Sequence, residues 1–231
     1  MINQELEKLY NTHKSNLTGL FDDEFDGPLL MYCWEEEFKA SDYKILFVGK
    51  ELNGWIGYFA DDIDLLRKRY EDFGLCTQEG SNRNSRLWKY MYDFNSRLNP
   101  ACEGKKNFMW TNVSKCCTWK GKGLDWESHQ KIVANFNVLE CEIKILQPDV
   151  IIFFTGPYYD DKIRIQITDD LVFRQVVEHI PSRELARLEN INLPYFTYRL
   201  YHPDYMDIYK PDKRSHLDII ENEIKTVNVK A

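Results

Sequence analysis

Three polar residues that are far apart in the sequence each stand at the end of an apolar segment. These residues are Glu51, Asn112 and His202. In open α/β proteins the carboxyl ends of parallel strands share one edge of the sheet, and ligands bind there. We therefore expect a carboxylate, an amide and an imidazole to meet at one edge, a combination that suggests hydrolysis of a bond to a polar heterocycle. The apolar segments that read as strands cover residues 44–48, 108–111, 150–154 and 196–201.

The remaining pattern indicates how these segments are connected. Residues 126–147 carry apolar side chains at helical spacing, which predicts one long helix that ends before Pro148. This helix leads directly into the apolar segment 150–154. The alternation of strand, helix and strand predicts an α/β fold with a parallel sheet of four main strands and right-handed crossovers. Further helices are expected from about residue 61, over 85–98 and over 211–227.

The chain is expected to form one domain that spans residues 1–231. Its length suits a single α/β domain, and no repeat, low-complexity tract or Pro/Gly-rich linker divides it. The acidic segment 1–42 has apolar residues at helical spacing, among them Leu6 and Tyr10. We expect this segment to be a helical N-terminal extension that packs on the domain and serves as cover.

Composition favours a soluble protein that works in the cytoplasm. The chain is 43% hydrophobic, yet no apolar run is long enough to span a bilayer, and the first residues lack the features of an export signal. The six cysteines show no C-x-x-C pair, which argues against a zinc ribbon or a disulfide framework. Most cysteines are expected to fill the core, and the adjacent pair Cys116 and Cys117 is the less favoured alternative of a reactive thiol site.

Positive charge is concentrated in one part of an acidic chain. The net charge is −7, but residues 83–122 contain nine basic and two acidic residues. Aromatic residues, including Trp88 and Trp110, are interleaved with these cations, and this combination suits phosphates and stacked bases. The alternative of equal weight is a solvated basic helix with aromatic residues in the core. The segment is therefore expected either to bind DNA or to form a basic surface that faces solvent.

With these segments in place, the chain resembles the uracil-DNA glycosylase superfamily over about residues 44–203. The order is the same as in the family: a first motif with a Gly, an Asn-bearing strand, a Gly-ended strand and a His-Pro motif. The resemblance implies a three-layer α/β/α fold around a central four-stranded parallel twisted sheet. It also implies hydrolysis of the N-glycosidic bond of uracil, or of a related damaged or modified base, in DNA. No metal or cofactor is implied, and the four-cysteine pattern of the iron–sulfur branches is absent from the sequence.

The resemblance assigns roles to residues in the first motif, Gly49 to Trp55. Gly49 is implied to lie against the base, and Glu51 to position the attacking water. Asn53 is a second candidate for holding that water, because Leu52 stands where the family has a proline. An aromatic residue after the motif stacks on the extruded base in the family. The candidates here are Tyr58 and Phe59, which have the best spacing, and Trp55.

Two further roles follow from the later motifs. Asn112 matches the base-reading amide, which donates to O4 of a pyrimidine and accepts from its N3–H. The alternative reading is an asparagine that caps its strand by bonding the backbone. His202 matches the histidine that donates to O2 of the departing base as negative charge develops there. The alternative reading is a solvent-exposed loop histidine.

The expected DNA contacts come from two places in the chain. Asp204 replaces the serine that follows His-Pro in the family, and Tyr205 and Met206 occupy the loop whose side chain holds the base out of the duplex. The lysines expected to bind phosphate are Lys115, Lys120 and Lys122. The predicted protein is thus a monomeric DNA glycosylase that acts on single- or double-stranded DNA.

Two other functions remain open from the sequence. The first is a glycosylase-like module that binds nucleic acid or a modified base without cutting, which the acidic charge and Asp204 favour. The second is a doubly wound enzyme that acts on a free nucleoside or another small molecule and has no affinity for DNA. Neutralising the three lysines would weaken binding in either DNA reading and leave the second function unaffected.

Overall fold

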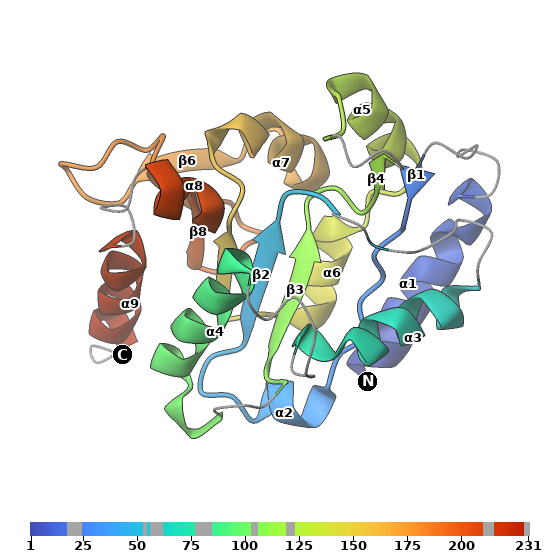
Figure 1. Cartoon of the computed structure of the whole chain (residues 1–231), viewed down its shortest axis with the longest axis horizontal. Coiled ribbons are helices and arrows are strands. Elements are labelled where there is room, and N and C mark those ends of the chain that lie inside the picture. Colours follow the sequence, from blue (N-terminus) through green and yellow to red (C-terminus); the bar gives the residue numbers. More distant parts are fainter. Residues whose placement is uncertain are drawn as a thin grey trace.

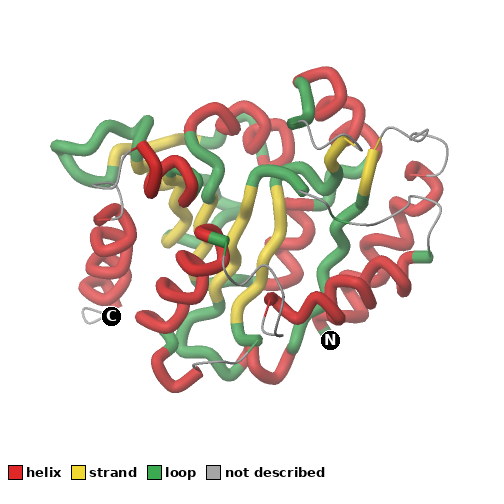
Figure 2. The backbone as a smooth tube through the Cα atoms, viewed as in Figure 1, coloured by secondary structure: helices red, strands yellow, loops and turns green. Residues whose placement is uncertain are grey.

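The computed structural model of the chain describes residues 1–17, 25–52, 55, 62–76, 85–102, 106–118, 123–209 and 215–228. Within these ranges a six-stranded mixed sheet has helices on both faces, with α4 in front of the sheet and α6 behind it in the view of Figure 1. Figure 2 shows the same arrangement as strands in the middle and helices around them. None of the helices in the described ranges is long and apolar enough to cross a membrane.

The elements have the following bounds. The strands are β1 Phe25–Asp26, β2 Ile45–Gly49, β3 Phe108–Asn112, β4 Cys117–Thr118, β5 Val150–Phe153, β6 Val172–Gln175, β7 Leu185–Glu189 and β8 Phe196–Leu200. The helices are α1 Ile2–Leu17, α2 Glu35–Lys39, α3 Ile63–Phe73, α4 Arg86–Leu98, α5 Trp126–Asn135, α6 Leu139–Leu146, α7 Asp160–Ile167, α8 Pro203–Tyr209 and α9 Ser215–Asn228. Short 3₁₀ helices cover Gly74–Cys76, Pro100–Cys102 and Pro157–Tyr159.

The main sheet has the strand order β3-β2-β5-β8-β7-β6. The four predicted strands are β3, β2, β5 and β8, and they are adjacent and parallel to one another. The sheet as a whole is six-stranded and mixed rather than four-stranded and parallel, because β7 pairs antiparallel with β8 and β6 pairs antiparallel with β7. Strand β6 lies at the edge of the sheet and is largely exposed, so it lacks the apolar run that marks a buried strand.

Most of the predicted helices are present. Helix α3 begins after Asp62, α4 begins after Ser85, whose hydroxyl caps the Trp88 N–H, and α9 closes the chain within the described residues. The single helix expected over 126–147 was wrong, because the chain forms α5 and α6 with a break at 136–138. Asparagines on both sides of Phe136 are poor helix formers.

The break also lets the two helices serve two hydrophobic clusters. Ile132 of α5 packs in a small cluster with Phe25, Cys116 and Leu124. Phe136 and the apolar residues of α6 pack instead in the main core under the sheet. One straight helix could not present its apolar stripe to both clusters.

A buried polar network joins the N-terminal helix to the sheet. The Lys115 ammonium contacts the Thr111 hydroxyl and the Glu142 carboxylate, and both charged side chains are almost fully buried. The Tyr10 hydroxyl donates to Glu142 Oε1 at 2.8 Å and accepts from the Met31 N–H at 3.1 Å. Burial raises the pKa of Glu142 and lowers that of Lys115. Helix α1 is therefore part of the core rather than a cover placed on it.

Candidate functional site

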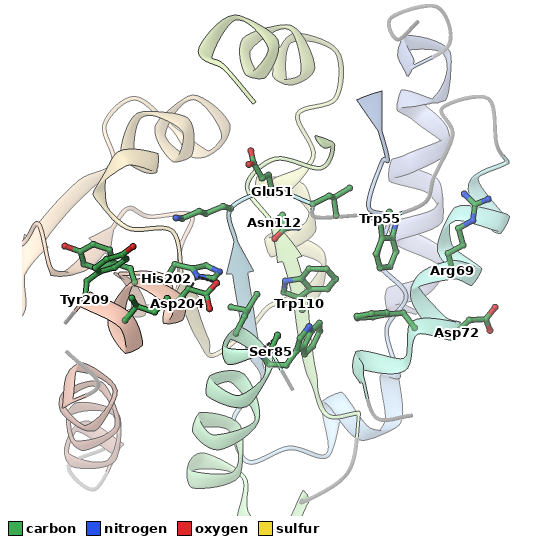
Figure 3. Close-up of a pocket in the computed structure, with 17 residues that line it drawn as sticks. Glu51, Trp55, Arg69, Asp72, Ser85, Trp110, Asn112, His202, Asp204 and Tyr209 are labelled. Carbon is green, nitrogen blue, oxygen red and sulfur yellow. Dashed lines mark hydrogen bonds and ion pairs between the residues drawn. The ribbon is translucent and has the colours of Figure 1, made fainter. Parts of the chain in front are cut away.

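A cavity of about 1140 Å³ lies over the carboxyl ends of β2 and β3. Its walls come from the start of α4, from α3 and from α8, and Figure 3 shows the side chains that line it. Glu51, Asn112 and His202 all line this one cavity. The topology thus brings together the three side chains that the strand ends predicted, because β2, β3 and β8 end at the same edge of the sheet.

The amide of Asn112 lies across the neighbouring strand and is almost fully buried. Asn112 pairs in register with Gly49, and a Cβ added to Gly49 would lie 2.3 Å from Asn112 Oδ1. Gly49 therefore leaves the space that the amide occupies, which is a more specific role than general contact with a base. The Asn112 side chain is only 1% exposed, and its Nδ2 has no hydrogen-bond partner among the described residues. That unpartnered donor argues against the interpretation of Asn112 as a strand cap.

The carboxylate of Glu51 is held by two donors at the rim of the cavity. Glu51 Oε2 accepts from the Leu124 N–H at 3.0 Å and from the Tyr159 hydroxyl at 3.1 Å. A Cβ on Gly123 would lie 2.9 Å from Glu51 Oε1, so the backbone also approaches closely there. In Figure 3 the carboxylate points away from the Asn112 amide. The site therefore contains a fixed acceptor whose position is set by the segment before α5 and by the turn before α7.

Tyr159 is a site residue that the sequence analysis missed. Burial, together with the Glu51 charge, raises the pKa of Tyr159 well above its usual value, so the hydroxyl stays protonated and donates to the carboxylate. The available signal was its position: Tyr159 stands three residues after Gly156, where the third apolar segment ends.

His202 is a neutral donor in this setting. Its Nδ1 accepts from the Asp204 N–H at 3.2 Å, which leaves the proton on Nε2. Burial and, to a smaller extent, the nearby Lys50 charge lower the pKa of His202 to about 4, and the Asp204 charge opposes the shift. The ring is mostly buried, so the reading of His202 as a solvent-exposed loop residue does not hold. At neutral pH the imidazole can donate from Nε2 without carrying a charge.

The charges at the cavity edge are partly balanced. Asp204 forms an ion pair with Arg86 at 3.4 Å, and the same guanidinium is 3.3 Å from Asp207. Lys50 also lines the cavity, and burial lowers its pKa while Glu51 and Asp204 oppose that shift. Arg86 therefore offsets part of the negative charge that Asp204 brings to the cavity edge.

Aromatic side chains form the wall beyond Asn112. The rings of Trp55, Phe73 and Trp88 surround that of Trp110, with centroid distances to it of 6.1, 5.9 and 5.2 Å. All four line the cavity. Trp88 and Trp110, which the sequence analysis placed with the basic segment, thus belong to the cavity wall.

Two predicted DNA contacts are not at the surface. Lys115 is 1% exposed and its charge is neutralised by Glu142, so it is unable to reach a phosphate without leaving the core. Met206 is fully buried on the inner side of α8, so the prediction of Met206 as a wedge was wrong. Tyr205, its neighbour, is partly exposed and lines the cavity. The predicted residues Asn53, Tyr58, Phe59, Lys120 and Lys122 lie outside the described residues.

Neither thiol chemistry nor a metal centre is built into the described part of the chain. Cys116 and Cys117 are both buried, and burial raises the pKa of Cys116, which disfavours the reactive thiolate. No group of three or more His, Cys, Asp or Glu side chains within the described ranges could hold a metal ion.

No known family model and no curated protein matches this chain.

Proposed function

We propose that the chain is a DNA glycosylase that hydrolyses the N-glycosidic bond of uracil or of a related damaged or modified base. The single observation that carries this proposal is the position of Glu51, Asn112 and His202 on one cavity. Its second support is the resemblance in the order of motifs. The cavity lies where open α/β proteins bind ligands, and it is large enough for an extruded nucleotide.

Asn112 would read the base. Its Nδ2 is a buried donor without a partner in the described structure, so an O4 carbonyl would satisfy it, while Oδ1 would accept from N3–H. A cytosine would present its amino donor to the same Nδ2, which would then remain unsatisfied. An unsatisfied buried donor costs about 1–3 kcal/mol, and this cost is the source of the expected selectivity.

His202 and Glu51 would lower the barrier from opposite sides of the reacting bond. As the bond between the sugar C1′ and the base nitrogen breaks, both bonding electrons go to the base. The Nε2–H of the neutral imidazole would donate to the base oxygen on which this charge develops. The Glu51 carboxylate would orient the water that forms the new bond to C1′ and would offset the positive charge on the sugar. The attacking water gives one proton to the Glu51 carboxylate, the base anion takes up one proton from solvent, and the products are the free base and an abasic site.

The experiment is excision from oligonucleotides that each contain one altered base, followed by alkaline scission of the abasic strand. We expect uracil to be released by the unmodified protein, and Glu51→Gln and His202→Ala to slow release by roughly 10²–10³-fold, as for loss of a single stabilising donor. The matched controls are Glu178→Gln and His179→Ala, because both residues are exposed and lie outside the cavity. Equal rates for Glu51→Gln, His202→Ala and their controls would refute the assigned roles.

A second candidate, hydrolysis of the same bond in a free nucleoside, is favoured by the burial of Lys115 and by the carboxylates of Asp204 and Asp207 on α8. These features weaken the attraction for a phosphate backbone. Release of uracil from uridine or deoxyuridine, with no binding to an oligonucleotide at low salt, would identify this function. The free thiols of Cys33, Cys102, Cys116, Cys117 and Cys141 suit the reducing cytoplasm, where we propose that the protein works as a monomer.

A further inference from the structure

Lys50 is a cation in the cavity that the proposed mechanism does not use. It follows Gly49 at the carboxyl end of β2, and its side chain lines the same cavity as Glu51 and His202. The Lys50 carbonyl accepts from the Ser114 N–H at 2.8 Å, just beyond the last paired residues of β2 and β3. The backbone that carries this amine is therefore anchored at the edge of the sheet.

The Lys50 ammonium lies among the charged and titratable groups of the site. Its charge lowers the pKa of His202, and the charges of Glu51 and Asp204 act in turn on Lys50. Figure 3 shows Glu51 on one side of the cavity and His202 with Asp204 on another, so the ammonium is within reach of both. Within the described ranges neither carboxylate forms an ion pair with Lys50, and Asp204 pairs with Arg86 instead. The amine is therefore near the reacting groups without being held by a partner there.

A half-buried amine in this position is suited to react as a nucleophile. Burial lowers the pKa of Lys50, although Glu51 and Asp204 oppose the shift, so more of the amine is unprotonated at neutral pH than in an exposed lysine. Only the unprotonated amine has the lone pair that attacks a carbonyl carbon. The alternative role, a cation that binds phosphate, is disfavoured by the carboxylates of Asp204 and Asp207 at the same edge of the cavity.

The product of the proposed reaction supplies such a carbonyl carbon. Loss of the base leaves a hemiacetal at C1′ of the sugar, and this hemiacetal opens reversibly to an aldehyde. The cavity volume of about 1140 Å³ exceeds the roughly 300–1,000 Å³ of sites that hold a drug-sized ligand, so the sugar fits as well as the base. The aldehyde would therefore form in the cavity that Lys50 lines.

We propose that Lys50 attacks C1′ of the abasic site and that the protein then cuts the strand on the 3′ side of that site. This inference, a lyase activity, rests on the proposed function for the source of the abasic site. The lone pair of the amine forms a bond to C1′, and loss of one water molecule gives a protonated imine. The imine draws electrons from C2′ and makes its protons acidic.

The strand is cut by elimination from this imine. The Glu51 carboxylate, after returning to solvent the proton that it took from water, accepts a proton from C2′. The electrons of that C–H bond form a double bond between C2′ and C3′, and the bond from C3′ to oxygen breaks with its electrons leaving on the phosphate. Hydrolysis of the imine regains the water lost earlier and frees Lys50. The products are a strand that ends in an unsaturated aldehyde and a strand that begins with a 5′-phosphate.

The test uses an oligonucleotide with an abasic site made beforehand by acid depurination, so it needs no base excision. The full-length protein is mixed with this oligonucleotide at neutral pH, and sodium borohydride reduces the imine to a stable cross-link. We expect the unmodified protein to be trapped and, without borohydride, to cut the strand in the absence of alkali. Lys50→Arg keeps the positive charge and removes the nucleophile, so it should abolish both results. Lys144→Arg is the matched control, because Lys144 is exposed and lies outside the cavity.

The possible outcomes separate this inference from the proposed function. Absence of a cross-link to the unmodified protein overturns the inference, as does equal trapping of Lys50→Arg, which a purely electrostatic role predicts. If Lys50→Arg fails to fold, mass spectrometry of the trapped unmodified protein locates the modified amine, and an adduct elsewhere than on Lys50 overturns the inference. Uracil release that always needs alkali for strand scission would refute the inference alone. Trapping at Lys50 without uracil release would support the inference and refute the proposed excision.

Discussion

The two faces of β3 treat buried polar groups in opposite ways. Side chains alternate along a strand, so Thr111 points to one face while Trp110 and Asn112 point to the other. On the first face Thr111 joins a network in which Lys115 and Glu142 neutralise each other. On the second face the donors of Trp110 and Asn112 have no partner in the described structure.

This difference separates structural polar groups from functional ones. Buried polar groups are costly unless they are paired, so a satisfied network indicates a role in holding the fold together. Donors that line a cavity without partners raise the free energy of the empty protein and lower it when a ligand supplies acceptors. The comparison predicts that substitutions on the first face change stability, whereas substitutions on the second face change binding and activity.

The largest effect is expected from Lys115→Met. This substitution leaves Glu142 buried without its counter-charge, and we expect a loss of about 3–5 kcal/mol in the free energy of unfolding, measured by urea denaturation. The double variant Lys115→Met with Glu142→Gln removes both charges and keeps an acceptor for Tyr10, so it should recover most of the loss. A Lys115→Met protein as stable as the parent would remove the distinction between the two faces.

The pH dependence of stability tests the cavity face. Histidine titrates near 6.5 in the unfolded chain, whereas burial lowers the pKa of His202 to about 4 in the folded protein. The unfolded state therefore binds more protons between these values, and stability falls as the pH decreases from about 6.5 to about 4, by at most about 3 kcal/mol. His129, whose pKa is also lowered to about 4, adds a fall in the same direction. The difference between the unmodified protein and His202→Gln isolates the contribution of His202.

An NMR titration of the His202 ring checks the same assignment directly. A midpoint near 4 is expected, and a midpoint near 6.5 would show that the ring is hydrated and charged in mildly acidic solution. If His202 is already neutral at pH 6.5, its titration should cause no inflection in the excision rate near that pH. The pH profiles of the unmodified protein and of His202→Gln should therefore have the same shape near pH 6.5.

Asn112→Ala should affect ligand binding far more than stability. The substitution removes a donor that has no partner, so the free energy of unfolding should stay the same or rise slightly. Loss of the hydrogen bonds to the base should weaken uracil binding by about 1–3 kcal/mol. Calorimetric titration of uracil and urea denaturation of the same protein measure the two quantities. A loss of stability with unchanged affinity would place Asn112 with the structural groups.

The smallest effect is expected from Tyr159→Phe. This substitution removes one of the two donors that hold Glu51 Oε2 and leaves the Leu124 N–H in place. We expect the excision rate to fall by roughly fivefold, or about 1 kcal/mol, with uracil affinity unchanged. Tyr158→Phe is the matched control, because the neighbouring Tyr158 is exposed and lies outside the cavity. A fall in affinity without a fall in rate would contradict the positioning role.

The sequence was sufficient to predict the parts of the fold and site that depend on local pattern. Apolar runs identified the four parallel strands, and the ends of these strands identified Glu51, Asn112 and His202. It was insufficient where tertiary contacts decide. Strand β6 is too exposed to be recognised, and the periodic apolar pattern of residues 126–147 did not show that α5 and α6 pack in two different clusters. Lys115 was predicted to bind phosphate because it belongs to the basic segment. Its ion-pair partner, Glu142, is 27 residues away in the chain, so the local sequence gave no sign that the charge is neutralised.

The contact between Tyr10 and Glu142 has a practical consequence for handling the protein. Helix α1 covers the buried ion pair: the Glu142 carboxylate and the Lys115 ammonium are shielded from solvent only while the Tyr10 ring is in place. A protease cut between α1 and β2 should therefore give complete digestion rather than a shortened, stable fragment, and affinity tags are better attached at the other end of the chain.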